Sequence, residues 1–239
     1  MKSCVVVPTY NEADNLAGFA TAVLALRVPH LEVLIVDDAS PDGTGRIVDD
    51  LAEQYAGQVH VLHRIGLRGL GRAYVDGFHW AIGHGAERVI QMDADFSHSP
   101  GYLPAFLDKS ADYDVVVGSR YVPGGALDKK WEAGRMFLSA WANFYARAIL
   151  RLRVHDATAG YKCWASPALQ RINLDRVRSN GYVFQVEMAY LSQRLGLRVL
   201  EVPIYFEDRR IGQSKMSIPV KLEAAWRVWQ VWWRHHNVK

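Results

Sequence analysis

The first half of the chain alternates between short apolar runs and stretches whose apolar residues repeat at helical spacing. Runs rich in β-branched residues predict buried strands at 4–7, 33–36, 59–62 and 89–92. The stretches between them predict helices through Leu16–Leu26, Ile47–Tyr55 and Tyr74–Ile82. Because strands that alternate with helices form parallel sheets with right-handed crossovers, we expect an α/β fold with a mostly parallel central sheet flanked by helices.

Polar residues follow three of these predicted strands at their carboxyl ends. The first strand leads into 8–12 (Pro-Thr-Tyr-Asn-Glu), the second into Asp37 and Asp38, and the fourth into Asp93 and Asp95. In open parallel sheets, ligands bind outside the carboxyl ends of the strands. We therefore expect these clusters to meet at one edge of the sheet and to form a binding site.

Asp93 and Asp95 are separated by one small residue, Ala94. If the strand extends through them, both carboxylates point to the same side, because side chains alternate with period two. Two hard oxygen donors in this position suit Mg²⁺ or Mn²⁺, and such an ion keeps coordination positions open for the phosphates of a substrate. Aspartates that cap a helix or a turn are the alternative interpretation, and the pair alone does not decide between the two.

Glycine-rich nucleotide motifs do not occur at the expected positions. A dinucleotide-binding site needs Gly-x-Gly-x-x-Gly directly after a strand, yet the first strand leads into Pro8–Glu12. Gly69 and Gly71 follow the third strand without a third glycine, and the sequence has no Gly-x-x-x-x-Gly-Lys-Ser/Thr motif. These observations argue against an oxidoreductase and against a P-loop enzyme. Phosphates would then be neutralised by a metal ion and by basic side chains.

Composition is that of an ordinary globular protein. The chain has 239 residues, of which 50% are hydrophobic and 22% charged, so it can bury one large core. The formal net charge of +3 is too small to indicate nucleic-acid binding. Cys4 and Cys163 have no metal-ligand partners nearby in the sequence, which favours a reducing compartment. We expect no signal peptide and no membrane span, because no uncharged run approaches the ~18 residues that a span needs.

Several stretches carry a resemblance to a known family. They are the segments 8–12, 36–44, 69–74, 92–95, 118–121, 181–185, 201–204 and 208–216. On these segments, the chain from residue 3 to residue 217 resembles the family 2 glycosyltransferases of the GT-A type, specifically the polyprenol (dolichol) monophosphomannose synthases. The segment Asp208–Met216 (Asp-Arg-x-x-Gly-x-Ser-Lys-Met) is the most specific motif, whereas the first, second and fourth segments are shared by many family 2 transferases.

The resemblance implies a GT-A (Rossmann-like) catalytic domain over 1–217, followed by an amphipathic helix over 218–239. It implies inverting transfer of mannose from GDP-mannose to polyprenyl phosphate, with Mg²⁺ or Mn²⁺ as cofactor. The implied nucleoside pocket consists of Pro8, Tyr10, Glu12, Val36 and Asp38. The implied metal site consists of Asp93, the Ala94 backbone and Asp95. Further substrate contacts are implied for Arg120, Arg135, Gln185, Arg209 and Lys215, and catalytic roles for Asp95, Arg120, Arg209 and Lys215.

The chain departs from the pattern of the family in three segments. Ser97 stands where relatives commonly have a glutamine that can be a third metal ligand, so metal coordination by the shorter Ser97 hydroxyl is left open. Leu67 and Arg68 precede Gly-Leu-Gly where many relatives have a lysine, which leaves a phosphate role of this loop open as well. Lys162 stands where relatives usually have an arginine.

The implied reaction needs no strong general base, because the acceptor phosphate is already anionic at neutral pH. The protein instead has to hold two anions together, with a metal on one and basic side chains on the other. Glu187 either orients the sugar hydroxyls or serves as a carboxylate at a helix start. The alternative functions are a related transferase that uses UDP-glucose or another nucleotide sugar, and a non-catalytic sugar-nucleotide-binding membrane subunit.

Two amphipathic segments suit contact with a lipid surface. The segment 136–152 places Phe137, Trp141, Phe144 and Ala148 on one helix face. The tail places Ile218, Leu222, Ala225, Trp226, Trp229 and Trp233 on one face, with basic residues beside it. Tryptophan flanked by basic residues is typical of helices at an anionic lipid surface, whereas packing on the catalytic core is the alternative for both segments. We expect peripheral attachment at the cytoplasmic face of the membrane, directly or through a separate membrane-protein partner.

Overall fold

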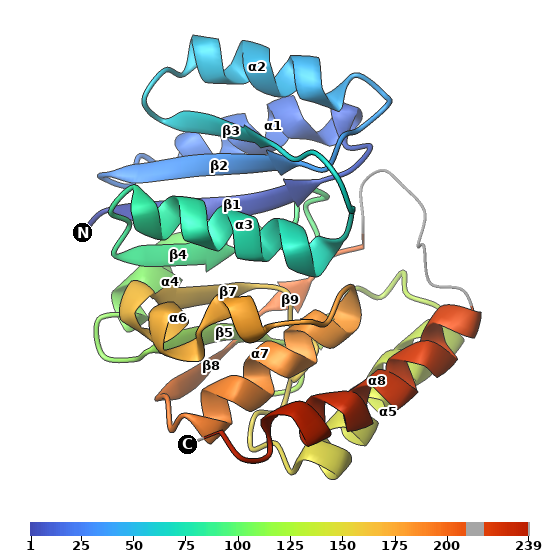
Figure 1. Cartoon of the computed structure of the whole chain (residues 1–239). Helices are drawn as coiled ribbons and strands as arrows, with labels where there is room; N and C mark the ends of the chain where they lie inside the picture. Colours follow the sequence, from blue (N-terminus) through green and yellow to red (C-terminus); the bar gives the residue numbers. More distant parts are fainter. Residues whose placement is uncertain (209–217, 239) are drawn as a thin grey trace.

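The computed structural model describes residues 1–208 and 218–238, without the side chains of 218–224. A seven-stranded sheet in the order β3-β2-β1-β4-β7-β5-β8 forms the centre, and helices cover both of its faces (Figure 1). The strands of this sheet are β1 (Ser3–Thr9), β2 (Leu31–Asp37), β3 (Val59–His63), β4 (Arg88–Gln91), β5 (Val115–Ser119), β7 (Lys162–Ala165) and β8 (Val199–Pro203). A separate pair of strands consists of β6 (Ala126–Leu127) and β9 (Tyr205–Phe206).

The helices of the described residues connect the strands or follow them. They are α1 (Ala13–Leu24), α2 (Thr44–Gln54), α3 (Leu70–Gly83), α4 (Leu103–Lys109), α5 (Ala133–Leu150), α6 (Ser166–Ile172), α7 (Tyr182–Arg194) and α8 (Ile218–His235), with short 3₁₀ turns η1 (Pro100–Tyr102) and η2 (Leu174–Arg176). The predicted α/β class is thus confirmed. The chain continues from α7 into β8, and α8 then lies beside α5 and α7 (Figure 1).

The first four strands lie where the apolar runs predict them, and they pair in parallel. β1 lies between two partners, with Val5 opposite Val33 of β2 and Ile90 of β4. β7 is antiparallel to both of its neighbours, since Cys163 pairs with Ile90 of β4 and with Val116 of β5. The sheet is therefore mostly, but not wholly, parallel.

Two strand ends differ from the sequence-based expectation. β1 continues through Pro8 to Thr9, and Pro8 pairs with Val36 of β2. The ladder between β1 and β4 ends at Val6, so Pro8 lies beyond the part of β1 that pairs with β4, where a missing amide hydrogen is tolerated. β4 ends at Gln91, before the two aspartates that follow it.

Apolar side chains fix the helices to both faces of the sheet. Tyr74 of α3 and Phe184 of α7 belong to the core on one face. Phe19 of α1, Val48 of α2 and Phe106 of α4 belong to the core on the other face. Complete burial of a large apolar side chain contributes about 1.5–3 kcal/mol, so these contacts hold the helices on the faces of the sheet.

The C-terminal helix α8 has one packed face. Val228 and Val231 lie in an apolar cluster with Leu150 of α5 and Val186 of α7. Packing on the core, the alternative interpretation of the tail, is therefore correct for this face of the helix. No helix of the described residues is long and apolar enough to cross a membrane.

Candidate active site

The carboxyl ends of β1, β2 and β4 meet at one edge of the sheet, as the sequence predicts. Thr9 pairs with Asp37 at the last position of the β1–β2 ladder, and the Asp38 amide donates to the Thr9 carbonyl at 3.0 Å. On the other side of β1, the Met92 amide donates to the Val6 carbonyl at 3.4 Å. The loops that follow these strands therefore begin side by side.

Asp38 is held by two groups that sequence reasoning did not assign to the site. Arg64, directly after β3, pairs with Asp38 Oδ1, and the Gly69 amide donates to Asp38 Oδ2 at 2.7 Å. The side chains of Arg64 and Asp38 are each 10% exposed. The carboxylate is thus oriented before any ligand binds. The position of Arg64 at the carboxyl end of the third strand is the sequence signal that could have identified it.

Tyr10, at the end of β1, contacts the loops after β2 and β3 through Arg68. The Arg68 guanidinium donates to the Tyr10 hydroxyl at 2.8 Å and lies 4.8 Å from the centre of the ring. It also donates to the Ala39 carbonyl at 3.0 Å. Glu12 accepts a hydrogen bond from the Asn15 side chain at 2.8 Å. Arg68 therefore joins three loops at the outer side of the predicted nucleoside pocket.

Asp93 and Asp95 lie in the loop after β4, so the expectation that strand alternation orients them is wrong. Asp93 accepts from the Tyr74 hydroxyl at 2.9 Å, and its side chain is 36% exposed. Asp95 is buried, and its Oδ1 accepts from the Ser97 hydroxyl at 2.6 Å and from the Ser97 amide at 3.0 Å. Phe96 has a φ of 62°, which turns the chain between Asp95 and Ser97.

His98 supports the same loop from inside the protein. The Asp93 amide donates to His98 Nδ1 at 3.1 Å, so this nitrogen is unprotonated and the neutral ring carries its proton on Nε2. Burial lowers the pKa of His98, which favours this neutral form. A Cβ added at Gly160 would lie 2.9 Å from His98 Cε1 and 3.7 Å from Asp93 Oδ2. The glycine therefore lets the chain pass close to the aspartate loop.

The donors at this loop fit a magnesium or manganese ion that is shared with a substrate. In the part of the chain that the structure describes, no three His, Cys, Asp or Glu side chains form a metal cluster. Asp93 and Asp95 supply carboxylate oxygens, the donors that these ions prefer, and such ions keep positions for water and phosphate oxygens. Ser97 directs its hydroxyl proton to Asp95, and its role as a third ligand stays a prediction.

Arg120 is predicted to bind phosphate, and its guanidinium is buried against Asp156. Nε and Nη2 each donate to one Asp156 oxygen at 2.7 Å, and Nη2 also donates to the Thr158 hydroxyl at 2.7 Å. Burial by itself raises the pKa of Asp156, but the charge and the hydrogen bonds of Arg120 outweigh it and the pKa is lowered. Burial likewise opposes the charge of Arg120, but Asp156 outweighs it and raises the pKa of the guanidinium. Both groups therefore stay ionised.

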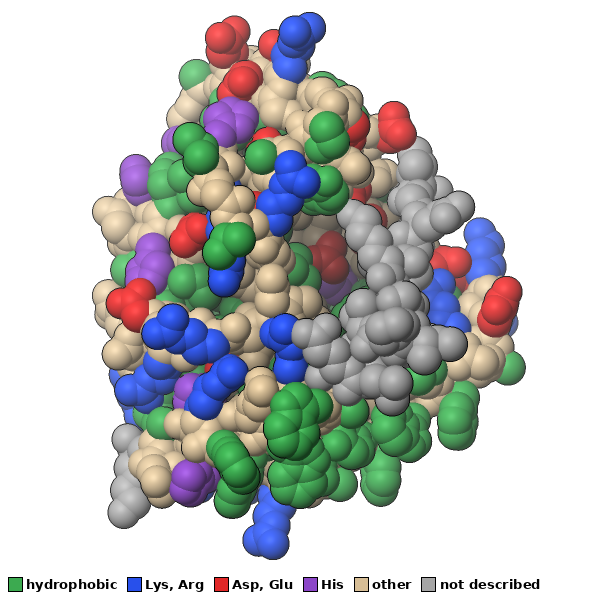
Figure 2. Space-filling view, turned by 45° about the vertical axis from the view of Figure 1, so that its right-hand side comes forward, with side chains coloured by type: hydrophobic (Ala, Val, Ile, Leu, Met, Phe, Trp, Pro, Cys, Tyr) green, Lys and Arg blue, Asp and Glu red, His purple; other side chains and the backbone are tan. Residues whose placement is uncertain are grey.

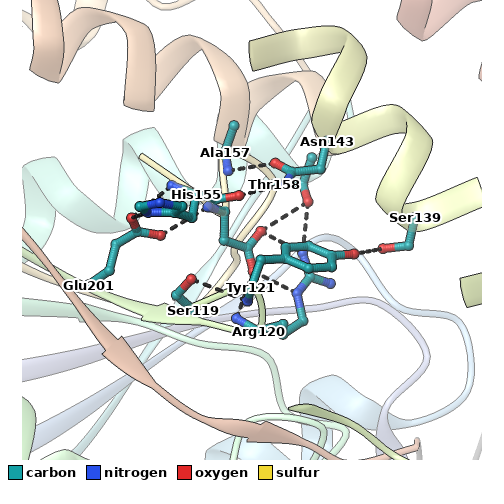
Figure 3. A network of polar contacts seen from close by, with 10 residues as sticks. Ser119, Arg120, Tyr121, Ser139, Asn143, His155, Ala157, Thr158 and Glu201 are labelled. Carbon is teal, nitrogen blue, oxygen red and sulfur yellow. Dashed lines mark hydrogen bonds and ion pairs between the residues drawn. The ribbon is translucent and has the colours of Figure 1, made fainter. Parts of the chain in front are cut away.

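The loop that carries Asp156 is tied to β8 and α5 (Figure 3). Glu201 of β8 accepts from the amides of His155 and Asp156 at 2.7 and 2.9 Å. Asn143 of α5 accepts from the Ala157 amide at 2.9 Å. The buried arginine–aspartate pair thus organises the loop, and a direct contact of this arginine with phosphate stays a prediction.

The other predicted basic residues lie near the end of the described chain or beyond it. Arg135, at the start of α5, donates to Asp208 at 2.7 Å. Its guanidinium lies 3.6 Å from the centre of the Trp131 ring, and the side chain is 37% exposed. Arg209 and Lys215 lie outside the described residues. Arg135 is thus placed beside Asp208, the first residue of the most specific motif.

Gln185, a predicted substrate contact, lies in a buried polar network behind the aspartate loop. Its Oε1 accepts from Gln91 Nε2 at 2.7 Å and from Lys162 Nζ at 2.8 Å. Burial lowers the pKa of Lys162 to about 7, because the charged ammonium loses its hydration. These contacts fix the last residue of β4, and a direct contact of Gln185 with substrate stays a prediction.

Glu187 faces the interior rather than an open site. Its carboxylate is fully buried and accepts from the Ser179 amide and from His235, both at 2.7 Å. Glu187 lies inside α7 rather than at the start of this helix, and its carboxylate holds the loop that precedes the helix.

The two amphipathic segments form one aromatic face. Trp141 stacks on Tyr145 within α5, with ring centres 5.3 Å apart, and the Trp229 indole of α8 donates to the Tyr145 hydroxyl at 3.0 Å. The large apolar side chains exposed on this face are Phe137, Trp141, Phe144, Trp226, Trp229 and Trp233. Figure 2 shows hydrophobic side chains gathered along the lower part of this side of the molecule, with Lys and Arg side chains nearby.

Comparison of the sequence with known families and proteins gives consistent matches. The profile of Glycosyl transferase family 2 matches residues 4–169. The polyprenol monophosphomannose synthase of Mycolicibacterium smegmatis is 42% identical over 228 residues, which are 95% of this chain and 85% of that protein. The undecaprenyl-phosphate mannosyltransferase of Micrococcus luteus is 44% identical over 217 residues, 91% of this chain and 88% of that protein.

Solved structures share the fold at low sequence identity. Mannosyl-3-phosphoglycerate synthase from Rubrobacter xylanophilus has a TM-score of 0.72 and 18% identity, with 99% of this chain and 75% of that chain covered. Glucosyl-3-phosphoglycerate synthase from Mycobacterium tuberculosis, solved with Mn²⁺, UDP and glucosyl-3-phosphoglycerate, has a TM-score of 0.67 and 17% identity, with 98% and 79% covered. These likenesses support the expected fold.

Proposed function

Because this chain belongs to glycosyl transferase family 2 and has the GT-A fold, we propose that it transfers mannose from GDP-mannose to polyprenyl phosphate. The products are GDP and polyprenyl phosphate mannose. The observation that supports this most strongly is the 42% and 44% identity, over nearly the whole chain, to a polyprenol monophosphomannose synthase and an undecaprenyl-phosphate mannosyltransferase.

In this proposal the nucleoside of the donor binds at the ends of β1 and β2. Asp38 is fixed by Arg64 and the Gly69 amide, so its carboxylate is ready to accept hydrogen bonds from base or ribose. Tyr10 is held by Arg68 and presents a ring on which a base can stack. Pro8, Glu12 and Val36 complete the proposed pocket.

Asp93 and Asp95 would hold Mg²⁺ or Mn²⁺ together with the donor diphosphate, and Ser97 is the candidate for a further ligand. Bound there, the ion would neutralise the charge that develops on the departing nucleoside diphosphate. Tyr74 orients Asp93 through its hydroxyl, and Ser97 orients Asp95. Hydrogen bonds from neighbouring side chains thus hold both carboxylates in place.

The acceptor phosphate is proposed to bind on basic side chains beside this site. Arg135 is partly exposed next to Asp208, and Arg209 and Lys215 follow Asp208 in the sequence. Because the phosphate arrives as an anion, its oxygen attacks without a general base, and a single displacement inverts the sugar carbon. Arginine suits this role because its planar fork contacts two phosphate oxygens at once.

The aromatic face of α5 and α8 is proposed to rest on the membrane that carries the lipid acceptor. Trp226 and Trp233 are 62% and 70% exposed, and Phe137 is 73% exposed. Exposed tryptophans beside basic residues favour the interface of an anionic bilayer. Attachment would be peripheral, at the cytoplasmic face. Attachment through a separate membrane-protein partner is the alternative.

Transfer assays test the donor and the acceptor together. The chain is incubated with radiolabelled GDP-mannose, Mg²⁺ and a polyprenyl phosphate, and lipid-extractable label is counted. We expect label from GDP-mannose and none from UDP-glucose; the reverse result would assign the alternative donor.

Asp95→Ala is expected to abolish transfer, and activity near that of the parent would contradict the metal role of Asp95. No transfer from any nucleotide sugar, with nucleotide binding retained, would favour the non-catalytic binding subunit.

Vesicle binding tests the aromatic face separately. Replacement of Trp226 and Trp233 by Ala in the full chain is expected to reduce pelleting with anionic vesicles while GDP binding stays unchanged. Unchanged pelleting would contradict the proposed membrane contact.

A further inference from the structure

Helix α3 begins beside the proposed nucleoside pocket without a cap of its own. Its N-cap residue is Gly69, which has no side chain to accept from the amides of the first turn. Asn180 supplies the missing acceptor, since its Oδ1 accepts from the Gly71 amide at 2.8 Å and from the Gly181 amide at 3.0 Å. The cap of α3 therefore comes from a loop 109 residues further along the chain.

The two loops fit against each other without spare room. A Cβ added at Gly69 would lie 1.8 Å from Asn180 Nδ2, and a Cβ added at Gly71 would lie 2.4 Å from the Ser179 carbonyl oxygen. The Gly69 amide in turn donates to Asp38 Oδ2 at 2.7 Å. Because Asn180 holds the first turn of α3 at this close approach, we expect its loss to shift the Gly69 amide that donates to Asp38.

The loop that carries Asn180 is itself fixed by a buried pair. Glu187 Oε2 accepts from the Ser179 amide at 2.7 Å and from the Arg178 amide at 3.2 Å. Glu187 Oε1 accepts from His235 Nε2 at 2.7 Å, and the exposed fractions of the two side chains are 0% and 4%. His235 is the last residue of α8. A continuous series of contacts thus leads from the C-terminal helix to Asp38.

We propose that Asn180 is a positioning residue for nucleotide binding, and that Glu187 and His235 make the C-terminal helix part of the same support. This inference rests on the proposed role of Asp38 in the nucleoside pocket. Its consequence is that the helix proposed to contact the membrane also contributes to the affinity for the donor. Asn180 acts through Gly69 and touches no substrate itself.

Calorimetric titration with GDP and Mg²⁺, and with UDP and Mn²⁺, tests the role of Asn180. Asn180→Ala removes the acceptor of two amides and is expected to weaken binding of the preferred nucleotide about five- to tenfold. Asn180→Asp keeps an oxygen that accepts from both amides, so it is expected to bind nearly as tightly as the parent. Asn237→Ala, an exposed change of the same size outside this series of contacts, is the matched control.

Three outcomes would overturn the role of Asn180. The first is a nucleotide affinity of Asn180→Ala within twofold of that of the parent. The second is an equal loss of nucleotide affinity in the Ala and Asp variants. The third, measured in the transfer assay, is an equal change in the KM values of donor and polyprenyl phosphate. Because the titration uses whichever nucleotide binds, a wrong donor assignment leaves this test intact. If neither nucleotide binds the parent chain, the pocket and this inference fail together.

The contribution of α8 is tested at His235. His235→Ala is expected to raise the KM for the donor several-fold with little change in the KM for the acceptor, and His235→Gln, which can donate to Glu187, is expected to restore it. A variant that lowers only the unfolding temperature would show that the pair merely stabilises the fold and would overturn this part of the proposal.

Discussion

The buried pair of Arg120 and Asp156 allows a sharp prediction of stability. Asp156→Asn keeps the size of the side chain but replaces one carboxylate oxygen by an NH₂ group. Asp156 Oδ2 accepts from the Arg120 amide at 3.0 Å and from Nε at 2.7 Å, and Oδ1 accepts from Nη2 and from Thr158. Whichever oxygen is replaced, the new donor therefore faces other donors, and the guanidinium loses its counter-charge.

The structure indicates a large effect, because neither group is near water. The Asp156 side chain is 0% exposed and the Arg120 side chain is 9% exposed. Removal of one partner of such a buried pair costs about 3–5 kcal/mol. For a chain of this size, each kcal/mol lowers the unfolding temperature by about 2–4 °C. Thermal and urea unfolding, followed by circular dichroism, measure both quantities.

Asp114→Asn is a matched control at the surface. Asp114 accepts from the amide of Arg198 at 2.8 Å and from its guanidinium at 3.3 and 3.4 Å, in the same arrangement as the buried pair. Here the arginine side chain is 66% exposed, so we expect the free energy of unfolding to fall by less than about 1 kcal/mol. Equal losses in the two variants would refute the argument that burial, rather than the hydrogen-bond pattern, sets the cost.

The remaining predictions concern the interior. Since burial lowers the pKa of Lys162 from 10.5 to about 7, the unfolded chain binds one more proton between these values, and stability rises with pH there. Lys162→Met is expected to reduce the rise of the free energy of unfolding with pH by up to about 1.4 kcal/mol per pH unit. The same pH dependence of urea unfolding in both proteins would contradict this prediction. Gly77→Ala is expected to cost about 1–3 kcal/mol, because its Cβ would lie 2.4 Å from Val6 Cγ1. Gly83→Ala in the same helix, with nothing within 4 Å, is the control and is expected to be neutral or stabilising; equal effects would argue against overpacking.

The sheet edge of the site could be predicted because its signals are local. Runs of β-branched residues mark β1, β2 and β4, and the rule for parallel strands brings their carboxyl ends together. Tyr10, Asp38 and Asp93 follow those ends and lie at one edge of the sheet, as expected. The orientation of the aspartates could not be predicted, because it depends on the positive φ of Phe96 and on the side chain of Ser97.

The support of the site could not be predicted, since it joins segments that are far apart in the sequence. No local pattern relates Asn180 to Gly71, or Arg120 to Asp156. The sequence likewise offered α8 as either a membrane helix or a packed helix. The structure confirms packing for the face with Val228 and Val231, whereas membrane contact of the face with the exposed tryptophans stays a prediction.

The place of β7 in the sheet also determines the order in which the chain can assemble during synthesis. β4 and β5 do not pair with each other, and both pair with β7, whose residues 162–165 are made long after theirs. Until those residues leave the ribosome, the nascent sheet β3-β2-β1-β4 ends in an unpaired edge, and β5 has no partner. Such open edges favour association with other chains. We therefore expect the nascent chain to be most prone to association before β7 has been made.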